Sequence, residues 1–150
     1  MRKIVAPLAA VLVALGALGA EGCRSAGGGS ADGGAVSSTG AVQEFLAAAR
    51  GGDVRTMATL FGTSNGSINA REDANDVEKR MRSLQCYLTH DAARVTDDLP
   101  APSGAGRRVT VELRQRNLTR RTDFTVVPGP HRRWFVESFD IQAVADLCHP

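Results

Sequence analysis

The sequence predicts an α+β domain in which helices precede antiparallel strands. Between residues 41 and 90, apolar residues recur at the spacing of one helix face. After Asp91 the pattern changes to an alternation of apolar and polar residues, which is typical of half-buried strands. Helices gathered before a run of strands indicate the α+β class. The length of 150 residues is enough for one domain.

The composition narrows the class of protein further. The net charge is +2, from 18 basic and 16 acidic side chains, and aromatic residues make up 5% of the chain. Neither value favours a nucleic-acid partner, and no recognition motif is present, so none is predicted. Three cysteines are too few for a small scaffold held together mainly by disulfides.

Residues 1–22 are predicted to form a bacterial secretory signal peptide. Arg2 and Lys3 give a positively charged start, and residues 4–20 carry no charge. The alternative is a permanent membrane helix. The uncharged run of 17 residues lies at the lower limit for a membrane span and contains Pro7, which favours the signal peptide.

Residues 20–23 resemble a lipobox, the site at which a bacterial lipoprotein is cleaved before a cysteine that receives lipid. Gly22 and Cys23 fit the pattern, whereas Ala20 and Glu21 depart from it. Ordinary signal-peptidase cleavage before Cys23 is the alternative. The resemblance implies a lipid on Cys23 that attaches the protein to a membrane of the bacterial cell envelope. The domain would then be periplasmic or surface-facing, with the outer membrane preferred.

Residues 23–40 are predicted to be a flexible tether. Of the 17 residues from 24 to 40, six are glycine and four are serine, so the stretch can bury little apolar surface. The folded domain is expected to span residues 41–150.

Three helices are predicted at the start of this domain. The first covers residues 41–50 and ends at two glycines, and the second covers residues 53–61 with Asp53 as its N-cap. Residues 62–67 are predicted to be a loop. The third helix begins at Asn75, which has the capping-box spacing to Glu78, and extends to residue 90.

Four strands are predicted after the helices. Residues 93–99 suit an edge strand because two prolines follow, and residues 109–114 alternate clearly. A turn at residues 116–117 leads into a strand that includes residues 124–127. Residues 134–141 are almost continuously aromatic or β-branched, which predicts a central strand covered on both faces.

The order of elements resembles the nuclear transport factor two-like (cystatin-like) superfamily. The resemblance rests on residues 41–62, AVQEFLAAARGGDVRTMATLFG, and on residues 132–141, RRWFVESFDI. It implies a cone-like domain in which the helices pack on a strongly curved antiparallel sheet. Among such proteins, the chain is most similar to small secreted or lipid-anchored members of unknown function.

The cysteines predict one disulfide. With Cys23 acylated, Cys86 and Cys148 remain as a pair in an oxidising compartment. On the third helix, Cys86 points away from the apolar stripe, so we expect it to meet the C-terminal tail. The alternative is a zinc site that adds His90 and His149. Because Cys148 and His149 are adjacent and cannot easily bind one ion, no metal or other cofactor is predicted.

Arginines gather between residues 107 and 133. Four of them, Arg114, Arg116, Arg120 and Arg121, form a candidate basic patch that would attract anionic lipid or an acidic protein. Arg114 and Arg116 alternate with Leu113 and Gln115, so the two arginines are expected to share a strand face. The alternative is an ordinary solvated surface.

The preferred function is a non-catalytic binding domain for a small ligand or an envelope protein. The alternative is a small enzyme with an acid–base pair of His90 and either Asp123 or Asp140; the resemblance also brings Tyr87 and Glu137 near a cavity. The interior distinguishes the two. A pocket lined by Trp134, Phe135 or Phe139 with a carboxylate near a histidine favours the enzyme, whereas an interior filled by these aromatics favours the binding domain.

Overall fold

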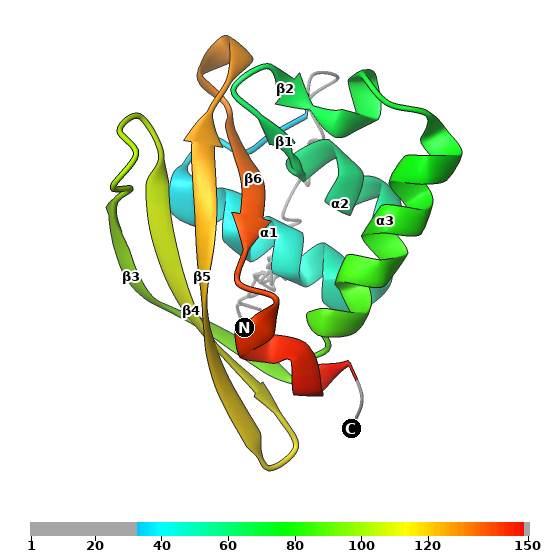
Figure 1. The fold of residues 1–150 in the computed structure, drawn as a ribbon, viewed down its shortest axis with the longest axis vertical. Helices are drawn as coiled ribbons and strands as arrows, with labels where there is room; N and C mark the ends of the chain where they lie inside the picture. Colours follow the sequence, from blue (N-terminus) through cyan, green and yellow to red (C-terminus); the bar gives the residue numbers. More distant parts are fainter. Residues whose placement is uncertain (1–32, 149–150) are drawn as a thin grey trace, which may run out of the picture.

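A computed structural model describes residues 33–148 of the chain. A four-stranded sheet forms one side of the molecule, and the helices lie against one face of it (Figure 1). The helices are α1 (Ser38–Gly51), α2 (Val54–Leu60) and α3 (Ala74–Tyr87), and the strands of the main sheet are β3 (Ala92–Pro100), β4 (Arg107–Gln115), β5 (Leu118–Pro128) and β6 (Trp134–Phe139). The short elements are β1 (Gly62–Thr63), β2 (Gly66–Ser67), η1 (Ile68–Ala70), η2 (Pro130–Arg132) and η3 (Gln142–Leu147).

The sheet is antiparallel throughout, with the strand order β3-β4-β5-β6. Helix α1 contacts all four strands, α2 packs beside α1, and α3 packs on α2 and reaches η3. The α+β class and the packing of helices on a curved antiparallel sheet are therefore confirmed (Figure 1).

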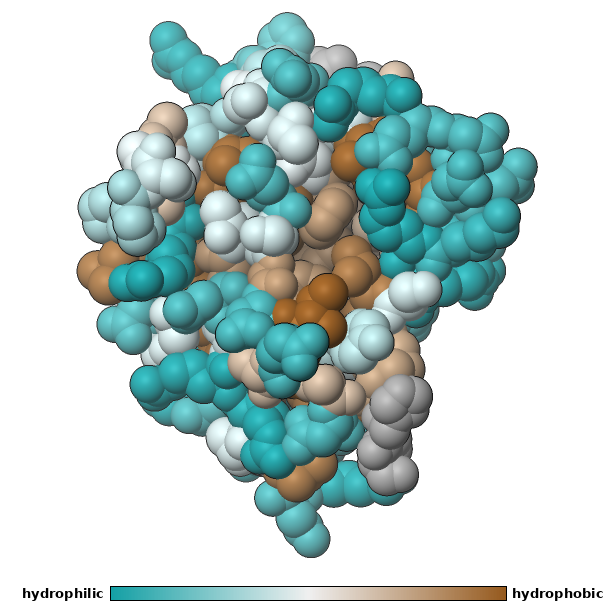
Figure 2. All heavy atoms as spheres, in the orientation of Figure 1, coloured by the Kyte–Doolittle hydropathy of each residue, from teal (hydrophilic) through white to brown (hydrophobic). Residues whose placement is uncertain are grey.

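The alternating pattern of the strands separates a buried face from a solvated one. On β4, Val109, Val111 and Leu113 are fully buried beneath the helices, while Thr110 and Glu112 point to the opposite face. An antiparallel sheet commonly keeps one face on the core and one in water. Figure 2 shows hydrophilic side chains over the sheet and over α3, with more hydrophobic atoms in the hollow between them.

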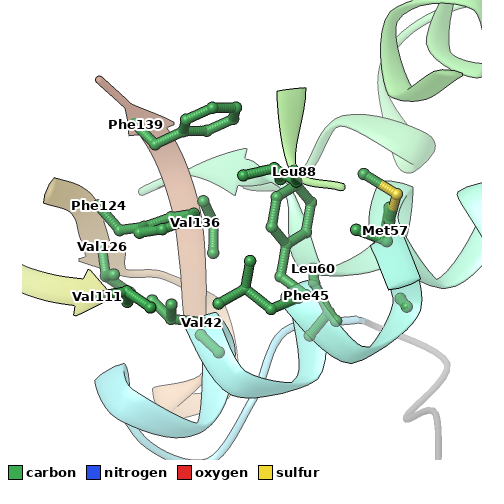
Figure 3. Close-up of a cluster of buried hydrophobic side chains, with 14 of the residues drawn as sticks. Val42, Phe45, Met57, Leu60, Leu88, Val111, Phe124, Val126, Val136 and Phe139 are labelled. Atoms are coloured by element: carbon green, nitrogen blue, oxygen red, sulfur yellow. The ribbon is translucent and has the colours of Figure 1, made fainter. Parts of the chain in front are cut away.

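The core forms where the apolar side of α1 meets the sheet. Val42 and Phe45 of α1 are fully buried, and they face Val111 of β4 and Phe124 of β5 (Figure 3). The rings of Phe124 and Phe139 stack with centroids 5.2 Å apart. The predicted apolar face of the first helix is thus the face that covers the sheet.

The prediction that residues 134–141 form a central strand is wrong, because β6 is an edge strand. Its outer edge is covered by two single bridges, from Ala35 to Trp134 and from Phe61 to Val136. These bridges and the packed helices bury its apolar residues as another full strand would. The sequence of a strand therefore predicts that the strand is buried, but not which element covers it.

The folded part begins before residue 41. Gly34 donates a backbone hydrogen bond to Thr59 O at 2.9 Å, and Arg133 Nη2 donates to Gly34 O at 2.6 Å. Ala35 is 1% exposed, and Ser37 caps α1. Residues 33–40 therefore belong to the domain rather than to a flexible tether; residues 1–32, with the predicted signal peptide and Cys23, lie outside the described residues.

Two local predictions also need correction. Helix α3 starts at Ala74 and its N-cap is Asp73, whose carboxylate accepts from the backbone of Asn75 and Asp76. Residues 62–67, predicted as a loop, form the small β1–β2 hairpin. At the start of α3, Asp73 rather than Asn75 supplies the capping side chain.

Asp98 joins the start of α1 to the sheet. Its carboxylate accepts from the hydroxyls of Ser38 at 2.7 Å and Thr39 at 2.9 Å, and from Arg107 Nε at 2.5 Å. Burial raises the pKa of Asp98, but the hydrogen bonds from Ser38, Arg107 and Thr39 outweigh it, so the pKa lies below 3.8. The ionised carboxylate thus stabilises the fold.

The substitution Gly34→Ala tests whether residues 33–35 belong to the folded domain. Gly34 has φ +71, and an added Cβ would lie 2.7 Å from Phe135 Cζ. We expect a loss of about 2 kcal/mol or more in urea unfolding, from backbone strain and the clash. Gly51→Ala, where nothing lies within 4 Å of an added Cβ, is the control and should not destabilise. Equal stability of both variants would contradict this packing.

The substitution Asp98→Asn should lower the free energy of unfolding by about 2 kcal/mol at neutral pH, because charge-assisted hydrogen bonds are lost. A carboxylate whose pKa is lower in the folded state stabilises above the unfolded pKa. The difference from wild type should therefore shrink as the pH falls below 3.8 toward the lower native value. Urea unfolding from pH 7 to pH 2.5 measures it, with the exposed Asp97→Asn as control. A difference that is constant with pH would contradict the role of the charge.

Candidate functional site

Cys86 and Cys148 form the predicted pair. Their sulfur atoms lie at bonding distance, and their Cα atoms are 4.7 Å apart. Cys86 comes from the last turn of α3, and Cys148 follows η3, whose Val144 and Leu147 are buried in the core. The disulfide therefore fixes the C-terminal segment against α3. Joined sulfurs cannot supply two thiolates, so the zinc alternative is wrong; its His149 lies outside the described residues.

The four arginines of the predicted basic patch do not share one surface. Arg114 and Arg121 are exposed on the outer face of the sheet, in register with Thr119 and Glu112. Arg120 is paired in register with the buried Leu113 and therefore extends to the opposite face. The predicted patch is divided by the sheet itself.

Arg120 binds Asp146 of η3 with two nitrogens; the contact from its Nε measures 2.9 Å. The hydrogen bond from Arg120 holds the pKa of Asp146 below its ordinary value, and Asp146 raises the pKa of Arg120.

Arg116 lies in the β4–β5 turn with φ 51, so the expectation that it shares a strand face with Arg114 is wrong. Its backbone N–H donates to Asp91 at 2.6 Å.

The outer face of the sheet mixes both signs of charge. Arg94 lies 3.4 Å from Glu112, and Arg108 lies 4.0 Å from Asp123. Exposed pairs of this kind contribute little to stability. They do, however, balance the arginines locally, so this face presents no uniform positive field.

The structure does not bring the proposed acid–base pair together. His90 is buried on the helix side of the sheet, where Nδ1 lies 2.7 Å from Leu88 O. Asp123 is exposed on the opposite face and accepts from Thr110 at 2.6 Å. Asp140 follows β6 and accepts from the backbone of Ala143.

The remaining candidates are also apart from an acid–base centre. Tyr87 is partly buried against the core at the end of α3, and Glu137 is exposed on β6. Phe135 and Phe139 are 1% and 9% exposed, and Trp134 packs against the core. Within residues 33–148, Trp134 and Phe139 pack with the core, whereas Phe135 packs against Gly34 and Gly129, and none of the three lines either of the two cavities between the helices and the sheet or between α2 and α3.

The larger cavity is a cleft of about 630 Å³ between α2 and α3. Three of the four charged side chains that line it, Asp53, Glu78 and Arg82, already have partners. Arg82 is paired with Glu78 at 2.6 Å, and Thr56 donates to Asp53, lowering the pKa of Asp53. A ligand there would have to compete with these contacts.

The smaller cavity, of about 210 Å³, lies between α1 and the first two strands of the main sheet. Three of its lining residues are polar, namely Gln43, Arg50 and His90. The other five are apolar: Leu46, Ala47, Ala93, Val95 and Val111. Sequence reasoning singled out His90 but missed Arg50 and Gln43. Their exposed positions on an amphipathic helix are those of ordinary solvated residues.

Residues 33–148 contain neither a membrane-spanning helix nor a cluster of metal-binding side chains. None of the helices in this range is long and apolar enough to cross a membrane. None of the His, Cys, Asp and Glu side chains in this range gather in threes or more as a metal site requires.

Replacing both Cys86 and Cys148 by serine should lower the free energy of unfolding by about 4 kcal/mol. The disulfide closes a loop with a sequence separation of 62, and the loss of this constraint stabilises the unfolded chain. Urea unfolding of the double variant measures the effect, and reduced wild-type protein should match it. A loss below about 1 kcal/mol would show that the bond does not constrain the unfolded chain.

Comparison of this chain with protein-family models, curated proteins and solved structures finds no match. The similarity to the nuclear transport factor two-like superfamily therefore stays a prediction from the order of the elements. What can be said about function must come from the residues themselves. The residues that line a cavity and also carry polar groups able to bind a ligand lie between α1 and β3.

Proposed function

We propose that this protein is a non-catalytic binding domain of the bacterial cell envelope, held at a membrane by a lipid on Cys23. It takes a small ligand or an envelope protein as its partner. The observation that carries this proposal is the pair Cys86–Cys148, which leaves Cys23 as the odd cysteine of three. Disulfides persist outside the cytoplasm, and a lipid accounts for the remaining thiol.

The packing of the interior supports binding rather than catalysis. An acid–base enzyme needs two titratable groups within reach of one substrate. In the described residues, His90 is buried on the helix side of the sheet and Asp123 is exposed on the other face, while Trp134 and Phe139 pack with the core. The cavities that remain lie at the edges of the helical layer and suit reversible binding of a small molecule.

The order of the elements supports the same proposal. Two helices, a short hairpin, a third helix and four antiparallel strands fit the resemblance to the nuclear transport factor two-like superfamily. We propose membership of a small secreted or lipid-anchored group within it.

Mass spectrometry of the mature protein from a bacterial host tests the lipid. We expect the first residue to be Cys23, carrying a diacylglyceryl group, and the protein to separate with membranes. Cys23→Ser should abolish the modification, and the neighbouring Ser25→Ala should retain it. Globomycin, which blocks lipoprotein signal peptidase, should cause the precursor to accumulate. An unmodified Cys23 at the mature N-terminus would refute the anchor.

A further inference from the structure

We propose that the cavity between α1 and β3 binds a short-chain monocarboxylic acid. The apolar chain would lie along the cavity wall, and the carboxyl group would bind His90 and Arg50. The inference rests on the proposed function, because it specifies the ligand of a binding domain. The central residue is His90, a buried side chain of which only one of the two ring nitrogens has a hydrogen-bond partner in the described residues.

His90 is 7% exposed and lines this cavity. Its Nδ1 lies 2.7 Å from Leu88 O, and a carbonyl oxygen can only accept, so Nδ1 carries the proton. In the neutral ring, Nε2 then has a lone pair and accepts. Nε2 has no hydrogen-bond partner within residues 33–148. Nε2 keeps accessible surface at the cavity, so a bound ligand can form a hydrogen bond with it.

Arg50 provides the positive charge at the mouth of the cavity. It lies in the last turn of α1, and its Nη1 donates to Asp91 O at 3.3 Å, which holds the guanidinium beside the residue that follows His90. The other N–H groups of the guanidinium make no hydrogen bond or ion pair to any described residue. A guanidinium with free donors favours a carboxylate.

Apart from Gln43, the rest of the cavity is apolar. Leu46 and Val111 are 3% and 0% exposed and form its floor, and Val95, Ala47 and Ala93 complete the wall. At about 30 Å³ for each water-sized group, a volume of about 210 Å³ holds about seven nonhydrogen atoms. This size suits butyrate, whereas the apolar walls disfavour a wholly polar anion such as phosphate.

A carboxylic acid can satisfy both polar groups at once. The ligand binds as its carboxylate, and Nε2 takes up one proton from solvent on binding, which gives an imidazolium beside the carboxylate. The N–H formed on Nε2 then donates to one carboxylate oxygen, and the guanidinium of Arg50 donates to the other. Butyrate has no proton to give at neutral pH, so binding takes up one proton from the buffer for each ligand bound.

The test uses residues 23–150 with Cys23→Ser, titrated with butyrate and followed by ¹H–¹⁵N NMR. We expect saturable shifts of the residues that line the cavity and a changed ¹⁵N shift of His90 Nε2. Butyramide, which has the same shape without the charge, should bind about tenfold more weakly, and phosphate should not shift these residues. Equal binding of butyramide would overturn the carboxylate, and the absence of saturable shifts would overturn the site.

Matched variants locate the binding. Arg50→Gln should weaken butyrate binding about tenfold, while Arg55→Gln removes the same charge on α2, outside this cavity, and should leave the affinity unchanged. Ala47→Met fills the mouth from an exposed position and should abolish binding without loss of thermal stability. Equal weakening by Arg50→Gln and Arg55→Gln would mean a nonspecific effect of charge and would overturn the inference.

The outcome is separable from the test of the lipid anchor. Butyrate binding is measured in solution on a chain without lipid, and acylation of Cys23 is measured by mass. If Cys23 is acylated but butyrate does not bind, the inference alone is overturned. If butyrate binds but Cys23 carries no lipid, the anchor alone is overturned.

Discussion

The packing of the apolar side of α1 on the inner face of the sheet is the interaction on which the other features depend. Val42 and Phe45 are fully buried, and α1 contacts every strand of the main sheet. Because α1 covers most of the strands, α2 packs mainly against α1 and α3 packs against α2. Truncation of a side chain such as Phe45 in this layer would cost about 3–5 kcal/mol. The cavity beside His90 exists because the cover is incomplete near β3.

Much of the fold could be predicted because burial leaves a periodic pattern along the chain. Val109, Val111 and Leu113 alternate with polar residues, and this alternation identified β4 and its buried face. The pairing of Cys86 with Cys148 followed from parity and from the direction of Cys86 on its helix. These inferences use only local geometry, which the sequence encodes directly.

The wrong predictions concern contacts between distant segments. Residues 134–139 look like a central strand, yet single bridges from Ala35 and Phe61 cover this edge. The glycines at 33 and 34 look like a tether. They have φ +70 and +71 and lie against Thr59 and Phe135, where a side chain would clash, so their role is conformational. The division of Arg120 and Arg121 between two faces has a local cause instead, since successive residues of a strand point to opposite faces.

The hydrogen bonds at residues 33–35 have a mechanical consequence. If the protein is held at Cys23, as we propose, any force between the membrane and a bound partner enters the domain at Gly33. There it is resisted by Arg133 on Gly34 O and by the reciprocal backbone bonds of Ala35 and Trp134. At the other end, the disulfide closes the chain from Cys86 to Cys148 and limits how far it can extend. Under tension, residues 33–35 would therefore detach from the domain first. The strands between Cys86 and Cys148 would not be pulled apart beyond the limit that the disulfide sets.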